Sequence, residues 1–174
     1  MNDNVLIEFT YHPNLYSNDI VKYEEGICQC CGKKVNIFIN FMYAEEDVSC
    51  ICLECVQNGK AAKKFNGTFI QDADPISSKE KEEILFKHTP GYSSWQGEYW
   101  LACCDDYCNY LGDVGRKDLD ELGITDEVIK EYCDEFCSGE FDLIKNNIEA
   151  KGSISGYLFR CRHCDKYKLY VDMD

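Results

Sequence analysis

The sequence predicts an α+β fold in which small antiparallel β elements carry zinc-ribbon-like knuckles and a helical segment is inserted before the C-terminal strands. Three features lead to this prediction: repeated Cys-x-x-Cys pairs, short runs of alternating apolar residues beside them, and one acidic stretch with helical periodicity. The Cys-x-x-Cys pairs are Cys28/Cys31, Cys52/Cys55 and Cys161/Cys164. Because the chain has 174 residues, of which 45% are apolar, we expect a single domain over 1–174 with a sizeable core.

The first half, residues 1–88, is expected to form around the first two cysteine pairs. The expected elements are strands at 5–11 and 34–43 and short helices at 56–65 and 79–86. In the second strand, apolar side chains occupy alternate positions from Val35 to Tyr43, which is typical of a half-buried strand. Gly59 lies in the middle of the first helix and weakens it. This half is therefore predicted to hold the first metal site on short β elements.

The second half, residues 89–174, is expected to place helices between strands. The expected elements are a strand at 98–103, a helical insertion over 113–152, and a closing hairpin with strands at 156–161 and 166–172. Within the insertion, Thr125 is a suitable N-cap, and an apolar stripe follows over 128–136. Gly139 is expected to end this helix, and a second short helix is expected to end near Gly152. The turn of the closing hairpin is the third cysteine pair.

The charge balance limits the class of partner. The chain carries 32 acidic residues against 18 lysines and arginines, a formal net charge of -14. Because such a surface repels phosphate backbones, we expect no direct nucleic-acid binding. The stretch from Asp118 to Asp142 holds ten carboxylates and one lysine. A solvated helical face is the simpler interpretation of this stretch, and a docking surface for a basic protein partner is the sharper one.

The sequence contains no recognisable membrane or export segment. No stretch approaches the roughly 20 apolar residues that span a bilayer, and the first residues lack the basic start and apolar run of a signal peptide. We therefore expect a cytoplasmic protein with no membrane association. In that compartment thiols stay reduced, so the thirteen cysteines are expected to bind metal rather than to form disulfides.

The first metal site is predicted at the two N-terminal pairs. Two Cys-x-x-Cys pairs separated by twenty residues bring four soft thiolates to one tetrahedral point, with zinc–sulfur bonds of about 2.3 Å. The predicted zinc ligands are Cys28, Cys31, Cys52 and Cys55. Cys30 lies inside its knuckle and Cys50 stands two residues before the second one, so both are expected to be bystanders.

The second metal site must be assembled at longer range. Cys161 and Cys164 need two partners, and the only other dense group of cysteines lies at 103–108. Cys104 and Cys108 have a three-residue spacer, within the range usual for zinc pairs, whereas Cys103 and Cys108 have four. Because strand alternation sends neighbouring side chains to opposite faces, only one of Cys103 and Cys104 is expected to bind. The predicted ligands are Cys104, Cys108, Cys161 and Cys164. Replacement of a thiolate by Asp105 or Asp106, and free or redox-active thiols, are the alternatives to this set.

No group of residues predicts a catalytic site. A closed four-sulfur zinc site has no open position for water or substrate, which excludes the usual metallohydrolase mechanism. Cys133 and Cys137 lie one turn apart on an apolar helical stripe, so we expect buried thiols rather than ligands. Trp95, Gln96, Glu98 and Trp100 cluster near the second site. They could line a groove, but completing the core is the simpler interpretation of the two tryptophans.

Several short motifs in order carry a family resemblance. They are FTYHP at 9–13, CQCCG at 28–32, YAEED at 43–47, CICLECVQNGKAAKKF at 50–65, TPGYSSWQGEYWL at 89–101, YLFRCRHC at 157–164 and LYVDMD at 169–174. With these motifs the chain resembles the bacterial CbrC family of colicin-tolerance proteins over nearly its whole length. Family members often have a histidine before the cysteine that follows the Trp-Leu strand, where this chain has Ala102-Cys103-Cys104. The resemblance implies tolerance of a nuclease-type toxin and supplies no catalytic residues.

Two functional classes follow from these observations. We expect a non-enzymatic cytoplasmic protein with two zinc ions that acts by binding a macromolecule, in the manner of an immunity protein. A basic nuclease toxin is a suitable partner, because an acidic surface would be steered to its cleft and block phosphate access. The alternative is a thiol-based redox enzyme or sensor that uses cysteines outside the zinc sites, with Cys103 as the candidate.

Overall fold

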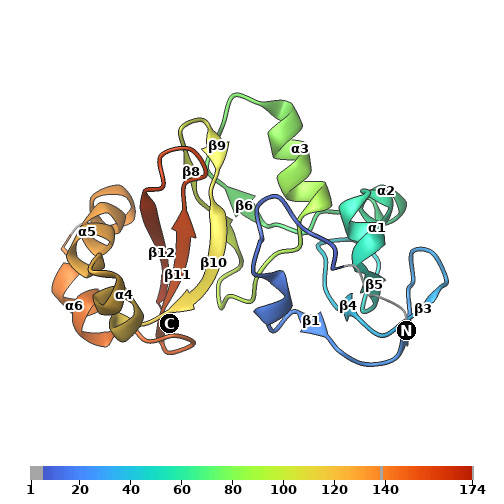
Figure 1. The fold of residues 1–174 in the computed structure, drawn as a ribbon, viewed down its shortest axis with the longest axis horizontal. Coiled ribbons are helices and arrows are strands. Elements are labelled where there is room, and N and C mark those ends of the chain that lie inside the picture. Colours follow the sequence, from blue (N-terminus) through green and yellow to red (C-terminus); the bar gives the residue numbers. More distant parts are fainter. Residues whose placement is uncertain (1–5, 138, 174) are drawn as a thin grey trace.

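The computed structural model describes residues 6–137 and 139–173. It has the expected α+β character, with mostly short antiparallel strands and six helices within these residues. Figure 1 shows an N-terminal group of elements on one side, a three-stranded sheet covered by helices on the other, and α3 with the β8–β9 hairpin between them. Buried apolar side chains form three clusters, one in each of these regions.

The N-terminal part is built from strands of only two residues and from two short helices. These elements are β1 (Val21–Lys22), β2 (Gly26–Ile27), β3 (Lys34–Val35), β4 (Phe38–Ile39), β5 (Ile51–Cys52), α1 (Leu53–Gln57) and α2 (Lys60–Phe65), preceded by a 3-10 turn at Leu15–Ser17. β1, β4 and β5 form one antiparallel sheet, and β2 pairs with β3. The predicted helix at 56–65 is two helices, because Gly59 takes a left-handed conformation with φ +71°.

The strand predictions in this part were partly wrong. The expected strand at 34–43 bends after Val35 and re-forms as β4, where Phe38 and Ile39 are both buried, so the period-two pattern breaks. The expected strand at 5–11 is irregular over 6–11, and residue 5 lies outside the described residues. Its side chains explain this conformation, because Phe9 belongs to the N-terminal core cluster and Tyr11 to the central one.

The central part holds one longer helix and two small strand pairs. The elements are β6 (Asp72–Ala73), α3 (Lys79–His88), β7 (Tyr99–Trp100), β8 (Ala102–Cys103) and β9 (Asp106–Tyr107). The helix predicted at 79–86 is confirmed, and its N-terminus is capped by Ser78, whose Oγ accepts a hydrogen bond from Lys81 N at 3.3 Å. β6 pairs with β7 in parallel, and β8 with β9 as a tight hairpin. The expected strand at 98–103 is thus divided between two sheets.

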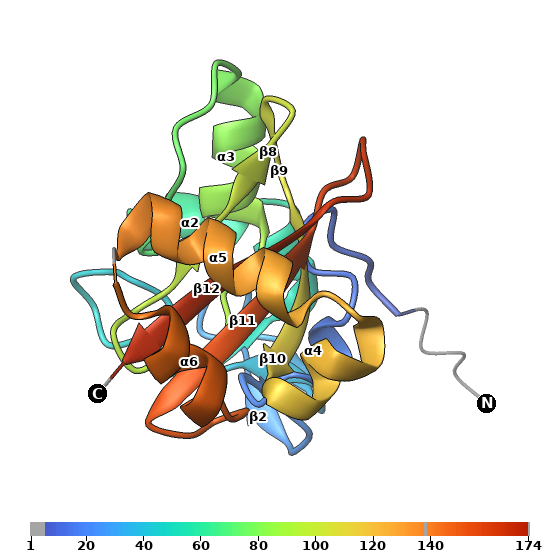
Figure 2. The ribbon, with the colours of Figure 1, turned by 90° about the vertical axis from the view of Figure 1, so that its left-hand side faces the viewer.

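The C-terminal part is a three-stranded antiparallel sheet with helices on one face. The elements are β10 (Asn109–Val114), α4 (Arg116–Leu122), α5 (Thr125–Phe136), α6 (Phe141–Asn147), β11 (Ile154–Arg160) and β12 (Tyr167–Met173). Figure 2 shows α5 lying across β11 and β12, with α4 and α6 beside it. Leu158 packs with these helices, whereas Tyr157 and Phe159 face the central cluster. The helical insertion and the closing hairpin are therefore confirmed, and β10 is an additional strand.

The insertion differs from the prediction in several details: α4 is an additional helix, and α6 ends at Asn147, five residues before Gly152. Thr125 is the first residue of α5 rather than its N-cap, because its Oγ1 donates to Asp120 Oδ1 at 2.5 Å instead of accepting from the helix. α5 ends at Phe136, shortly before Gly139, which has φ +96°. Within 6–137 and 139–173, no helix has both the length and the apolar character needed to cross a membrane.

Two candidate metal centres

The first cysteine cluster is built by two local turns. Cys28 and Cys31 lie in the turn between β2 and β3, where Cys28 N donates to Lys33 O at 2.9 Å and Gly32 N donates to Cys28 O at 2.7 Å. Gly32 has φ +74°, a conformation that glycine adopts without strain. Cys52 ends β5 and Cys55 lies in the first turn of α1. The change from strand to helix therefore turns both sulfurs toward the first knuckle.

The four sulfurs have the spacing of a tetrahedral metal site. The Sγ atoms of Cys28, Cys31, Cys52 and Cys55 all lie within 4.8 Å of one another, and Cys31 Sγ is 3.8 Å from Cys52 Sγ. Ligands at the corners of a tetrahedron with bonds of about 2.3 Å are about 3.8 Å apart. Three of these cysteines are at most 5% exposed, and Cys31 is the exposed one. The structure thus groups the four cysteines that the spacing predicts, and Cys30 and Cys50 lie outside the group.

The protonation of these thiols depends on burial and on backbone N–H groups. Burial alone would raise the pKa of Cys28, but N–H groups of Cys52, Cys31 and Cys30 point at its sulfur and lower the pKa to about 7. Burial raises the pKa of Cys52 to about 11 and also raises that of Cys55. Cys28 is therefore poised as the first thiolate, and a bound cation would favour deprotonation of the others.

Two residues outside the cysteines hold the first centre together. Gln29 Oε1 accepts from Ser49 N at 2.7 Å and from Cys50 N at 2.9 Å, which ties the first knuckle to the chain before the second. Lys64 Nζ, from α2, donates to the carbonyls of Gln29 at 2.7 Å and Cys30 at 3.0 Å. Sequence reasoning missed both residues, because neither belongs to a metal-binding motif.

The second cysteine cluster is formed by the turns of two hairpins. Cys104 and Asp105 form the two-residue turn between β8 and β9, and both are left-handed, with φ +56° and +55°. Cys161 and Cys164 lie in the turn after β11, closed by a hydrogen bond from Cys161 N to Lys166 O at 2.8 Å. The two turns meet tip to tip, so residues about sixty positions apart come together.

The sulfur geometry of the second cluster matches that of the first. The Sγ atoms of Cys103, Cys104, Cys161 and Cys164 lie within 4.8 Å of one another. Cys103 Sγ is 3.8 Å from Cys104 Sγ and 3.7 Å from Cys164 Sγ. Cys161 is the buried member, and burial would raise the pKa of its thiol. The N–H groups of Cys164 and His163, at 3.5 and 3.4 Å from its sulfur, instead lower that pKa to about 6.

The structure brings together three of the four cysteines predicted for this site, Cys104, Cys161 and Cys164, and leaves Cys108 outside the group. Cys108 is fully buried in the central cluster, and burial raises the pKa of its thiol to about 12. Its carbonyl accepts from Trp100 Nε1 at 2.9 Å, and its N–H donates to Leu101 O at 3.0 Å. Cys103 takes its place in the cluster. The alternation rule failed because Cys104 lies in a left-handed turn rather than in a strand, so its sulfur stays beside that of Cys103.

A buried carboxylate organises the surroundings of the second cluster. Asp106 is 3% exposed and accepts hydrogen bonds from Tyr11 Oη at 2.9 Å and from His163 Nε2 at 2.8 Å. Lys81 Nζ and Arg162 Nη1 lie 3.3 and 3.5 Å from the same carboxylate. Burial opposes its ionisation, but these donors keep its pKa below the ordinary value. Asp106 is thus not a member of the cluster; it joins the β8–β9 hairpin to the knuckle and to α3.

Lys168 connects the second cluster to the acidic helix. Its Nζ donates to Ala102 O at 3.3 Å, next to Cys103, and lies 3.5 Å from a carboxylate oxygen of Glu135 and 3.8 Å from one of Glu131 on α5. The side chain is only 12% exposed. The position of α5 therefore depends on the strand that carries the second knuckle.

Comparison with known proteins assigns the family. A family model described as "Uncharacterised protein family (UPF0167)" matches residues 6–173. A UPF0167 protein of Pseudomonas aeruginosa is 28% identical over 176 residues, which cover 97% of each chain. UPF0167 proteins of Mycobacterium bovis and Mycobacterium tuberculosis are 29% identical over 175 residues, 96% of this chain and 93% of theirs. No solved structure was found to match. The chain therefore belongs to the UPF0167 family.

Proposed function

We propose that each cysteine cluster holds one zinc ion and that both ions are structural. The observation that carries this proposal is the separation of 3.7–3.8 Å between sulfurs in both clusters. Four thiolates in a tetrahedron are the ligand set typical of structural zinc. Such a site is fully coordinated by protein, so the metal would organise the fold and would not bind substrate.

The shortness of the strands explains why a metal is needed. β1 to β5 have two residues each, and isolated strand pairs of this length are not stable in water. A zinc ion that joins the β2–β3 turn to the start of α1 would supply the missing stabilisation, because metal binding to a site absent from the unfolded chain is folding free energy. The second ion would join the two hairpin turns in the same way.

We further propose that the protein acts by binding a basic protein partner and not as an enzyme. The formal net charge of -14 supports this, since an acidic surface speeds encounter with a basic one. The acidic stretch at 118–142 has fewer unpaired negative charges than its sequence suggests, because lysines and an arginine from outside it form ion pairs with five of its carboxylates. These pairs are Arg116–Asp120, Lys117–Glu121, Lys145–Asp126, Lys166–Glu131 and Lys168–Glu135.

The free charge lies on a smaller set of side chains. Of the other five carboxylates, Asp118 accepts a hydrogen bond from Gly115 N and Glu140 is half-buried. Glu127, Asp134 and Asp142 are exposed and have no ion pair within the described part of the chain. We define these three residues as the acidic patch of α5 and α6. The resemblance to colicin-tolerance proteins supports a nuclease-type toxin as the partner, met in the bacterial cytoplasm, where the toxin would act on nucleic acid.

A binding assay with charge-reversed variants tests the partner proposal. Purified zinc-loaded protein is titrated against a basic colicin nuclease domain at low and moderate salt. Glu127→Lys with Asp134→Lys should slow association about tenfold or more at low salt. The matched control reverses Glu45 and Glu46, two exposed acids in the loop before β5. Equal effects of both pairs of substitutions would mean that the acidic patch is not the contact surface. No binding by the unmodified protein would refute this partner.

The redox alternative has less support. Burial raises the pKa of the thiols of Cys50, Cys108, Cys133 and Cys137. Thiols with raised pKa hold little of the reactive thiolate at neutral pH. Cys103, the candidate for this role, is one of the four clustered sulfurs of the second centre. A zinc-bound thiolate is not free for redox chemistry, so we favour the binding function.

A further inference from the structure

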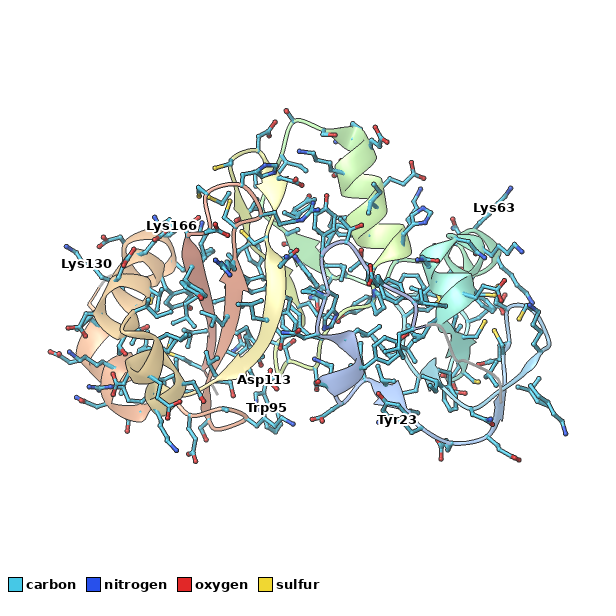
Figure 3. The ribbon with its side chains drawn as sticks, in the orientation of Figure 1. Tyr23, Lys63, Trp95, Asp113, Lys130 and Lys166 are labelled. Atoms are coloured by element: carbon cyan, nitrogen blue, oxygen red, sulfur yellow. The ribbon has the colours of Figure 1, made fainter. Side chains whose placement is uncertain are left out.

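A cleft of two neighbouring cavities lies between the N-terminal part and the C-terminal sheet. The larger has a volume of about 590 Å³ and the smaller of about 320 Å³. Asp19, Ser93, Ser94 and Trp95 line both, so the cavities adjoin. Figure 3 shows Trp95 at the same end of the sheet as Asp113, which lines the smaller cavity. The combined size suits a small ligand or a long side chain.

Exposed aromatic rings line this cleft. Trp95 is 70% exposed and Phe41 is 51% exposed, and both line the larger cavity. Phe41 packs edge to face on Tyr43, with ring centroids 4.8 Å apart. The chain's other tryptophan, Trp100, is fully buried. Large aromatic side chains left in water at a cavity are typical of a binding surface, and their faces attract cations.

A buried carboxylate without a cation lies in the wall of the larger cavity. Glu98 is 5% exposed, and Tyr43 Oη donates a hydrogen bond to it. Burial raises the pKa of Glu98 above its ordinary value. Within the described residues no lysine, arginine or histidine forms an ion pair with this carboxylate. Because a buried charge is costly unless it is paired, a cation in the cavity would complete the site.

The loop that carries Trp95 is held in place by a buried carboxylate of β12. Asp172, which is 1% exposed, accepts hydrogen bonds from Trp95 N at 3.0 Å, Gln96 N at 3.3 Å and Tyr157 Oη at 3.1 Å. Its other oxygen, Oδ1, and the buried Oγ of Ser94 have no hydrogen-bond partner among residues 6–137 and 139–173. These hydrogen bonds hold the wall in place, and Ser94, which lines both cavities, leaves its Oγ there as an unused polar atom.

The remaining charges of the cleft favour a cation over an anion. Three carboxylates line it, those of Asp19, Glu98 and Asp113, against two lysines. Lys151 is already paired with Asp19, and Asp113 accepts from Tyr110 Oη at 2.8 Å. An anionic ligand would meet net repulsion, and an uncharged ligand would leave Glu98 without a counter-ion.

We propose that this cleft binds an organic cation, an ammonium or guanidinium group on an alkyl chain. The charged head pairs with Glu98, and the chain lies against Trp95 and Phe41. The site is separate from the two cysteine clusters and from the acidic patch, so it stands whether or not the proposed partner is correct. The same chemistry is available from a free small molecule or from an arginine or lysine side chain of a protein.

Calorimetric titration of the full-length zinc-loaded protein tests the proposal. The probes are n-butylguanidinium and its neutral isostere N-butylurea, followed by a capped pentapeptide with a central arginine and its citrulline counterpart. We expect the guanidinium to bind with quenching of the exposed tryptophan emission, and the urea to bind at least about tenfold more weakly. Binding of the arginine peptide as well identifies a protein side chain as the ligand, and binding of the small cation alone identifies a free molecule.

Variants separate this site from a general charge effect. Glu98→Gln and Trp95→Ala should each lower the affinity for n-butylguanidinium about tenfold or more, whereas Glu45→Gln, at an exposed loop position, should leave it unchanged. Trp95 is exposed, so its replacement keeps the test valid even if Glu98→Gln fails to fold. No binding of the guanidinium at millimolar concentration, or equal binding to all variants, would overturn the proposal.

Discussion

Replacing Cys103 and Cys108 one at a time distinguishes the ligand set of the structure from the one that the spacing favours. Cys103→Ser removes one of four clustered sulfurs, whereas Cys108→Ala removes a thiol from the central core. Two zinc ions per chain should fall to one in the first variant. The second variant should retain both, because the sulfur of Cys108 is not one of the four grouped sulfurs.

The stability changes should differ as well. The second centre closes a loop of about 60 residues between the two hairpin turns, and by the loop-entropy estimate for a cross-link its loss costs about 4 kcal/mol. Removing one buried sulfur in Cys108→Ala costs about 1 kcal/mol. Metal analysis of the native protein gives the ion count, and urea unfolding gives the free energies. Loss of an ion from Cys108→Ala with two ions retained in Cys103→Ser would refute this assignment.

Three further predictions concern a buried histidine, the carboxylate beside the second centre and two glycines. Burial lowers the pKa of His12 to about 4. Between about pH 6.5 and pH 4, His12 is therefore protonated in the unfolded chain and neutral in the folded chain. The free energy of unfolding is therefore undiminished by this group above pH 6.5 and falls by at most about 3 kcal/mol as the pH is lowered. His12→Gln should make the free energy of urea unfolding depend less on pH in this range. An unchanged pH dependence would contradict this. Asp106→Asn should weaken zinc binding at the second centre about 10- to 100-fold and spare the first, as measured by chelator competition; equal weakening at both would argue against its local role. Gly59 and Gly123 both have positive φ, +71° and +69°, but a Cβ at Gly59 would lie 2.5 Å from His88 Cε1, whereas one at Gly123 meets nothing within 4 Å. Gly123→Ala should cost about 1–2 kcal/mol of conformational strain, and Gly59→Ala measurably more in thermal unfolding; equal costs would mean that His88 moves freely.

The features that sequence could predict are those fixed by neighbours in the chain. The first centre is local, since each pair lies in its own turn and only one short segment separates them. The closing hairpin was also predictable, because β11 and β12 keep a regular pattern over seven residues each. The second centre was not, since the choice of Cys103 depends on a left-handed conformation at Cys104 that spacing does not reveal.

Longer-range contacts account for the other differences. β10 escaped prediction because Gly112, with φ +138°, and Asp113 interrupt its apolar pattern, while pairing with β11 holds it in the sheet. The charge of the acidic stretch was overestimated for a similar reason. Lys145 approaches it from α6, Lys166 from the turn before β12 and Lys168 from β12, all far along the chain from Asp118.

The irregular segment at 6–11 affects how the protein unfolds. Phe9 is held in one core and Tyr11 in the next, and Tyr11 O also accepts from Tyr110 N at 2.9 Å. Farther along, Asn14 Nδ2 donates to Leu111 O at 2.9 Å. These few residues connect the N-terminal part to β10, the edge strand of the C-terminal sheet. Unfolding of either region would therefore break contacts with the other. Cooperativity between the two regions would then depend in part on a stretch with no regular secondary structure, beside contacts such as the Lys151–Asp19 ion pair.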